Sequence, residues 1–513
     1  MAGWFSTLTH SHHLRGGDES LESASRKLVD WCQKEGIRAF GVGSPWEPVS
    51  QRNYVKYETT HREQYDAGQV DLEPLKNEQG VREFLEGLNR MSGGKTFFYL
   101  DNETPKARYG HLWWLNWHYD VPPWHDYSQD RPIQYYRNDP EQEWNPVAGR
   151  PFRRRPYLEI LRNQRAHGAL GVWAHPTSWW REEGKFITNI AAEAGLHLLA
   201  QGFLDGLVVM GYDVFQSHYQ ALWFDWLDTG AVIPGFAESD MANSQIGSRK
   251  GHPLMISHLY CPDGVSVEAL TEAGRSGMAV ATTGGLAVPR AGDVNMGSVL
   301  TLAKGEERDM TVDLVPTPGE DYFSRVEILG RGGKVLFSRD HVPAGRLTLK
   351  IQGDGRPDYR VVRAYGAYDH PEMVDPMKIR HLVLSNPLYL HPPGFVMEPV
   401  HTELTLSADS NSPYANQPFE LRSFEGEILE QGALDKVRKL RVPADAFLNF
   451  PGMSEPWPLY PCMENQAAQN LLAYLWQGHF LKDFPKCQPG HVPPEAWRMN
   501  ELRDALASQT LIL

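Results

Sequence analysis

The chain has 513 residues, of which 41% are hydrophobic and 22% are charged, a composition that is ordinary for a globular protein. Its formal net charge of -14 argues against nucleic acid as the main partner, and because no apolar run reaches about 18 residues we expect no membrane span. A divalent metal in a pocket could still reverse the charge locally, so an anionic substrate is not excluded.

Two further features bear on the cellular compartment. No signal peptide precedes the first motif, which favours a cytoplasmic protein, or a periplasmic or secreted one if a leader has been removed. The four cysteines form no CxxC pair and no zinc-knuckle spacing, so we interpret them as unpaired thiols. Cys462 and Cys487 are the one pair that we consider for a disulfide bond.

Up to about residue 260, short apolar runs alternate with amphipathic helical patterns. We expect helices over 18–35, 81–91, 157–167, 187–201 and 217–227, followed in turn by strands at 38–43, 95–100, 170–174, 206–210 and 231–236. This order predicts a parallel α/β sheet, either open or closed into a barrel. The segment 119–156 is rich in Pro, Trp and Tyr, and we interpret it as a lid over the carboxyl ends of the strands.

Beyond residue 290 the pattern changes to short alternating strands separated by Gly, Pro and Asp turns, which is typical of a β-sandwich. A further β-like piece covers 400–440, and a helix is expected over 466–481. We therefore predict three domains: a metallohydrolase barrel over 1–290 with its lid insert, a β-sandwich domain over 291–400, and strands with a helical tail over 401–513.

Residue types that bind metals recur at the ends of the predicted strands. His10 and His12 are two residues apart at the end of an apolar run, and residues i and i+2 of a strand point to the same side. Other strand ends carry Glu103, His111, His175 and Asp240. Each residue alone has an ordinary explanation as a turn or a helix cap. Together they are typical of a metallohydrolase barrel, whose ligands come from the tips of several strands.

The order of these motifs resembles the PHP superfamily of metal-dependent hydrolases, and more narrowly its carbaryl-hydrolase-like (CehA/McbA) branch. The resemblance rests on the HxH motif at 10–12, Glu103 followed by Gly110-His111, Ala174-His175-Pro176 and Ser239-Asp240. It continues through 268–285, 326–333 and 384–389, and it covers roughly residues 4–395.

That resemblance implies an α/β fold with a distorted (β/α)7 barrel, and one or two divalent metal ions (zinc, manganese or iron) at its mouth. It implies the metal ligands His10, His12, Glu103, His175 and Asp240, with His111 as a ligand or a substrate contact. The chain departs from the family pattern twice, because 43–47 lacks the usual Asp-His and no histidine follows two residues after Asp240. Glu47, His252 or His258 would have to replace these ligands.

Catalytic and substrate-contacting residues are less sharply defined. His111 or His118 could protonate a leaving group, although His118 can equally belong to the lid. Aromatic faces near strand ends stack on sugar or aryl rings, and an arginine could hold an anionic group. The substrate candidates of these two kinds are Trp46, Trp179, Trp180 and Arg181. Core packing and a surface charge are the ordinary alternatives.

The first functional hypothesis is a metal-dependent hydrolase in which a metal-activated water attacks a small ester, phosphoester, carbamate or glycoside-related substrate. The alternative is a degenerate barrel that binds a carbohydrate or another ligand without turnover. Metal content separates the two, because a binding protein should keep its ligand affinity when stripped of metal. The expected partner is a small molecule, with no nucleic acid and no membrane, and a homo-oligomer is compatible with the sequence.

Overall fold

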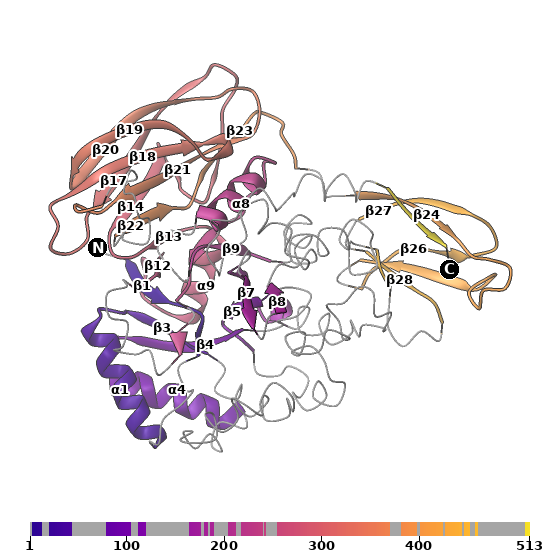
Figure 1. The fold of residues 1–513 in the computed structure, drawn as a ribbon, viewed down its shortest axis with the longest axis horizontal. Coiled ribbons are helices and arrows are strands. Elements are labelled where there is room, and N and C mark those ends of the chain that lie inside the picture. Colours follow the sequence, from indigo (N-terminus) through magenta and orange to yellow (C-terminus); the bar gives the residue numbers. More distant parts are fainter. Residues whose placement is uncertain are drawn as a thin grey trace.

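A computed structural model describes the chain at residues 3–12, 20–43, 78–103, 111–118, 164–175, 179–182, 185–188, 204–211, 217–239, 241–242, 254–369, 381–397, 401–423, 426–443, 446–451, 457–459 and 508–512. In this part of the chain, strands account for 48% of the residues and helices for 17%. Figure 1 shows one extended sheet together with several smaller ones. None of the described helices combines the length and the apolar character that a membrane crossing needs.

The first part of the long sheet joins strands that are far apart in the sequence. Its spatial order is β10 (Gly235–Ala237), β9 (Gly206–Met210), β6 (Leu170–Ala174), β5 (His111–Leu115), β4 (Phe97–Glu103), β3 (Ala39–Gly43), β1 (Trp4–Leu8), β12 (Ile256–Tyr260) and β13 (Ala279–Thr282). Pairing is parallel from β1 through β3 to β4 and from β6 through β9 to β10, whereas β5 is antiparallel to both β4 and β6. Since β5 runs opposite to both β4 and β6, β4 and β6 run in the same direction. The carboxyl ends of β1, β4, β6 and β10 therefore lie at one edge of the sheet.

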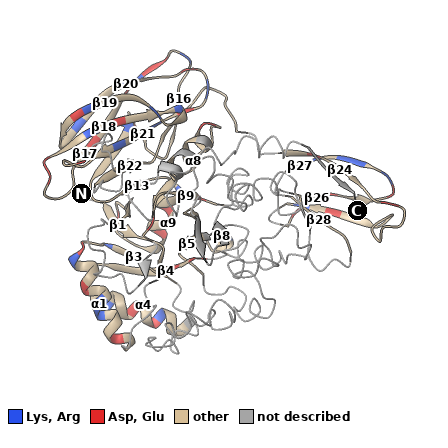
Figure 2. Cartoon of the chain, in the orientation of Figure 1, with Lys and Arg blue, Asp and Glu red and all other residues tan. Residues whose placement is uncertain are grey.

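The described part of the chain contains four α-helices: α1 (Leu21–Lys34), α4 (Glu78–Ser92), α8 (Ser217–Leu227) and α9 (Val267–Arg275). The hydroxyls of Ser20 and Ser266 cap α1 and α9 by accepting a backbone N–H of the first turn. Charged residues of both signs lie along α1 and α4 (Figure 2). On α1, Arg26 forms an ion pair with Glu22 one turn away. The apolar stripes of both helices are buried with β3 and β4 in one cluster, so the charged stripes face outward.

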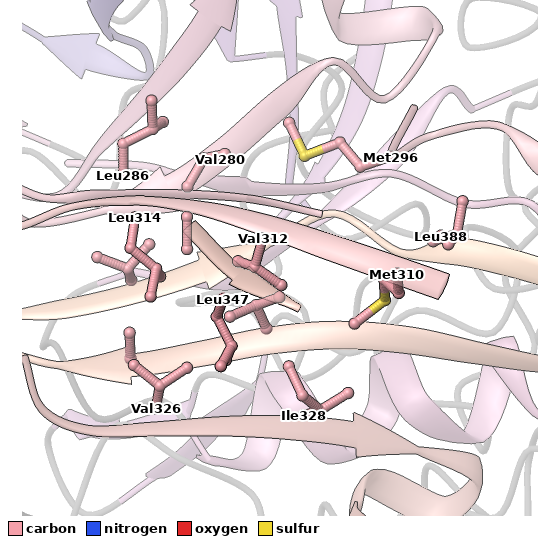
Figure 3. Packing of buried hydrophobic residues seen from close by; sticks show 14 of the residues in the cluster. Val280, Leu286, Met296, Met310, Val312, Leu314, Val326, Ile328, Leu347 and Leu388 are labelled. Carbon is pink, nitrogen blue, oxygen red and sulfur yellow. The ribbon is translucent and has the colours of Figure 1, made fainter. Parts of the chain in front are cut away.

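Residues 286–391 form mostly antiparallel strands around a large apolar core. The strands are β14 (Leu286–Ala291), β15 (Val294–Asn295), β16 (Val299–Thr301), β17 (Glu307–Val315), β18 (Tyr322–Gly330), β19 (Lys334–Pro343), β20 (Gly345–Gln352), β21 (Asp358–Tyr365), β22 (Leu382–Ser385) and β23 (Leu388–His391). β17 pairs with β14 and β20, and β18 pairs with β19 and β21. Their alternating apolar residues, such as Leu314, Val326, Ile328 and Leu347, interdigitate in the core (Figure 3).

The last described strands build two small sheets. One contains β27 (Arg438–Pro443), β24 (His401–Ser407) and β30 (Ser508–Ile512), and the other contains β26 (Ile428–Ala433), β25 (Pro418–Arg422), β28 (Phe447–Asn449) and β29 (Trp457–Pro458). β30 joins β24 in parallel, and the other pairs are antiparallel. Leu404, Phe419 and Leu448 belong to a core cluster of their own, which explains why these strands pack together.

The predicted (β/α)7 barrel is wrong. The described residues contain too few helices for such a barrel, and the larger sheets are mixed or antiparallel. Short apolar runs marked many strand positions, but they carry no information about strand direction. β5 lies antiparallel between β4 and β6 in a sheet that was expected to be parallel. The sheet also continues from β13 through β22 and β21 into the region predicted as a β-sandwich.

Several other predictions of the sequence analysis are not decided by the fold. The lid segment 119–156 and the tail helix 466–481 lie outside the described residues, and the expected helices over 157–167 and 187–201 lie largely outside them. The division into three domains, with boundaries after residues 290 and 400, also stays a prediction.

Candidate metal centre

Three side chains that could bind one metal ion lie together at the edge of the long sheet where the strands end. His10 follows β1, Glu103 ends β4, and His175 follows β6. The Oε1 atom of Glu103 lies 3.2 Å from Nε2 of His10 and 3.3 Å from Nε2 of His175, and all three ligand atoms lie within 4.8 Å of one another. None of the three side chains is more than 3% exposed. We call these three residues the His10/Glu103/His175 triplet.

Both histidines of the triplet have a backbone conformation that L-residues seldom adopt. The φ angle is 56° at His10 and 26° at His175, and such a conformation costs about 1–3 kcal/mol at each residue. A carboxylate holds each backbone amide: the N–H of His10 donates to Oδ2 of Asp101 at 2.6 Å, and the N–H of His175 donates to Oε1 of Glu238 at 2.9 Å. Strained backbone held in this way is concentrated at functional sites.

Glu238 contacts both histidines, although the sequence analysis did not select it. Its Oε2 atom lies 2.6 Å from Nδ1 of His10, while its Oε1 atom accepts the backbone N–H of His175. An ionised carboxylate only accepts hydrogen bonds, so this contact places a proton on Nδ1 of His10 and turns Nε2 toward Glu103. The signal that could have found Glu238 is its position directly after β10, which is the same signal that selected Asp240.

The site concentrates negative charge. Asp101, Glu103 and Glu238 are all buried, and even two protonated imidazoles would leave these five side chains with a net negative charge. In its Nδ1-protonated form, His10 presents the Nε2 lone pair to a carboxylate oxygen of Glu103, and this contact is repulsive unless a proton or a cation lies between the two atoms. Two imidazoles and one carboxylate are a donor set that suits zinc, manganese or iron. The residues present therefore fit a divalent metal ion.

Close packing against β3 fixes the position of this edge. A Cβ atom on Gly41 would lie 2.5 Å from Oδ2 of Asp101, and one on Gly43 would overlap the backbone oxygen of Ser11, so both positions require glycine. The Ser11 hydroxyl donates to the carbonyl of Gly41 at 2.6 Å. Burial, followed by the Asp101 carboxylate, raises the pKa of Tyr99 well above its usual value, and the phenol beside the site stays neutral.

The structure brings together three of the five predicted metal ligands, namely those of the triplet. The backbone of His12, in β2 (Ser11–His12), pairs in parallel with β11 (Met241–Ala242), but its side chain lies outside the described residues. The backbone of His111 pairs with Ala174, but the side chain of His111 also lies outside the described residues. The strands β7 (Trp179–Glu182) and β8 (Lys185–Thr188) form a hairpin. The hairpin contains Trp179, Trp180 and Arg181, whose side chains are likewise outside the described residues. Trp46, Glu47, Asp240 and His252 lie wholly outside them.

Two further candidate histidines have described surroundings that do not join them to the triplet. The ring of His118 stacks on His167, with centroids 3.6 Å apart and an interplanar angle of 14°, and its backbone N–H donates to Gln164 at 2.7 Å. His258 is buried within β12, where its backbone pairs with Ser6 of β1. Burial lowers the pKa of His258 to about 4, so this imidazole is neutral near pH 7.

Comparisons with known proteins do not identify a family. No protein-family model matches the chain, and no curated protein matches it. Among solved structures, the human OSCAR ligand-binding domain is 13% identical, with a TM-score of 0.15 and coverage of 33% of this chain and 92% of that one. The apo structure of Bacteroides uniformis beta-glucuronidase 3 is 9% identical, with a TM-score of 0.16 and coverage of 86% of this chain and 60% of that one. Similarities this weak carry no argument about fold or function.

Proposed function

We propose that the protein is a metal-dependent hydrolase whose divalent metal ion is held by the His10/Glu103/His175 triplet. The observation that carries the proposal is the convergence of two imidazole nitrogens and one carboxylate oxygen, all buried and within 4.8 Å of one another. The PHP resemblance adds no weight, because no family model matches the chain. The proposal therefore rests on the local chemistry of the site.

Among the described residues, the triplet supplies three ligands, which is the number that many catalytic sites use. Three protein ligands with a further position open to water are typical of catalytic zinc, whereas structural zinc sites have four protein ligands. A divalent ion bound there would lower the pKa of a bound water toward neutrality and polarise the bond to be cleaved. His10 and His175 would each offer Nε2, and Glu103 would offer a carboxylate oxygen. Suitable substrates are small esters, phosphoesters, carbamates or glycoside-related compounds.

The test combines metal content with hydrolysis. The protein is loaded separately with zinc, manganese and iron, its metal content is determined by elemental analysis, and chromogenic esters and phosphoesters are then screened. We expect one or two equivalents of metal and metal-dependent hydrolysis, both lost in His10→Ala and His175→Ala. The control is His341→Ala, which removes an exposed histidine of β19 and should change neither readout.

Two other results would contradict the proposal in different ways. Bound metal without turnover of any substrate in the screen would favour a ligand-binding protein that uses the metal for recognition. No bound metal after loading with all three ions would remove the basis of the proposal and identify the triplet as a structural network of charged hydrogen bonds.

A further inference from the structure

We propose that Glu238 is the positioning residue of the metal site, which sets the tautomer of His10 and holds the backbone of His175. This inference rests on the proposed function, because it assigns a role around the same triplet. It adds a residue that does not belong to the triplet and that lies on the far side of the His10 ring from Glu103. The structure shows this placement through opposite ring nitrogens: Nδ1 faces Glu238, and Nε2 faces Glu103.

Glu238 is well suited to hold two strand ends in a fixed relation. Its side chain is fully buried. Its backbone N–H donates to the carbonyl of Met210 at the end of β9, and the hydroxyl of the next residue, Ser239, donates to the carbonyl of Met255 at 2.7 Å. A Cβ atom on Gly211 would lie 2.9 Å from Oε1 of Glu238, so the backbone approaches the carboxylate closely. The carboxylate therefore has little freedom to turn away from the histidines.

The chemistry requires a carboxylate at this position. Nδ1–H of His10 and the backbone N–H of His175 are both donors, and each takes one oxygen of Glu238. A metal-bound imidazole commonly donates its other N–H to a carboxylate, which fixes the ring and makes the metal-facing nitrogen more basic. Glutamine has the same shape but offers one acceptor oxygen and one NH2 donor. It can satisfy only one of the two donors.

This difference predicts which histidine changes in a Glu238→Gln variant. The backbone N–H of His175 is always a donor, so it will keep the remaining oxygen of the glutamine. The imidazole of His10 can adapt by moving its proton to Nε2 and accepting the new NH2 at Nδ1. The nitrogen that faces Glu103 would then carry a proton and could not bind a metal ion. A residue that only supported the fold would not move this proton.

The experiment therefore has two readouts on the full-length protein. NMR of isotope-labelled, metal-free protein, recorded at a pH high enough that His10 carries a single ring proton, determines which nitrogen holds that proton, with the signal assigned by its loss in His10→Gln. Chelator competition then measures the zinc affinity. In Glu238→Gln we expect the proton to leave Nδ1 for Nε2 and zinc affinity to fall by about 10–100-fold. Glu327→Gln is the control, because Glu327 is another buried glutamate of the long sheet, which pairs with Arg325 and should change neither readout.

An unchanged His10 tautomer together with a zinc affinity within about twofold of wild type would overturn the inference. If the wild-type protein binds no zinc, the proposed function fails, but the tautomer still tests whether Glu238 controls His10. If Glu238→Gln does not fold, Glu238→Asp replaces it. Glu238→Asp keeps the negative charge but shortens the side chain. It should therefore weaken zinc binding and lengthen the contact with Nδ1 of His10. A wild-type zinc affinity together with a wild-type His10 signal would overturn the inference.

Discussion

Buried carboxylates occur in two regions of the long sheet, and their described partners differ. At the edge that carries the triplet, Glu103 and Glu238 contact the imidazole of His10. In the β-rich region, Glu327 contacts the guanidinium groups of Arg325 and Arg363. An arginine stays protonated and neutralises its partner permanently, whereas an imidazole can lose a proton and offer a lone pair. Both groups of carboxylates are buried, so burial does not distinguish them. The histidine partner indicates that the carboxylates around His10, and not Glu327, could bind a metal ion in place of a proton.

The largest expected effect comes from exchanging the glutamates of the two regions for glutamine. Glu103→Gln should lower zinc affinity by about 100-fold or more, because it removes a proposed metal ligand. Glu327→Gln should leave zinc affinity unchanged and destabilise the fold by about 2–4 kcal/mol, since it leaves two arginines without their shared carboxylate. Chelator competition and urea unfolding measure the two quantities. Equal loss of zinc affinity in both variants would remove the distinction between the regions.

A second test concerns His258, a buried histidine whose pKa burial lowers to about 4. Well above pH 6.5 the imidazole is neutral in both the folded and the unfolded state. As the pH falls from about 6.5 toward 4, the unfolded state takes up a proton that the folded state resists, so roughly 3 kcal/mol of stability is lost in this window. Urea unfolding at about pH 7 and about pH 4.5 measures the loss, which should shrink in His258→Gln. An identical pH dependence in the variant would show that His258 does not contribute.

The smallest expected effect compares two glycine-to-alanine changes. In Gly41→Ala the new methyl group would displace the Asp101 carboxylate that holds His10, and the fold should lose about 1–3 kcal/mol. In Gly87→Ala, within α4, the nearest atom is the end of an arginine side chain at 4.0 Å, and the helix should gain about 0.5–1 kcal/mol. Thermal unfolding of both variants provides the measurement. Stabilisation by Gly41→Ala would contradict the close packing described for this edge.

The sequence predicted many strand positions, and it selected three residues that the structure brings together, but it did not predict the fold. The strands β3, β4, β6 and β9 lie where apolar runs indicated them, and the triplet was selected because ligand-type residues at strand ends are visible in one sequence. The direction of β5 and the continuation of the sheet beyond β13 depend on pairing between distant segments, which a periodic pattern does not encode.

Glu238 illustrates the same limit within the site. Glu238 and Asp240 are both acidic residues that follow β10, and the sequence analysis chose the second. Which carboxylate turns toward His10 depends on the neighbouring strands, because Glu238 is held by its backbone bond to Met210 and by the space that Gly211 leaves beside it. Such a contact becomes visible only when the strands are placed side by side.

The most direct test of the metal site is a crystal structure of the zinc-loaded protein with anomalous diffraction recorded at the zinc edge. The account predicts a peak bonded to Nε2 of His10, Nε2 of His175 and a carboxylate oxygen of Glu103, at distances of about 2.0–2.2 Å. Glu238 should remain bonded to Nδ1 of His10 in that structure. A zinc peak elsewhere with none at the triplet, or a metal-free triplet at saturating zinc, would contradict the central claim.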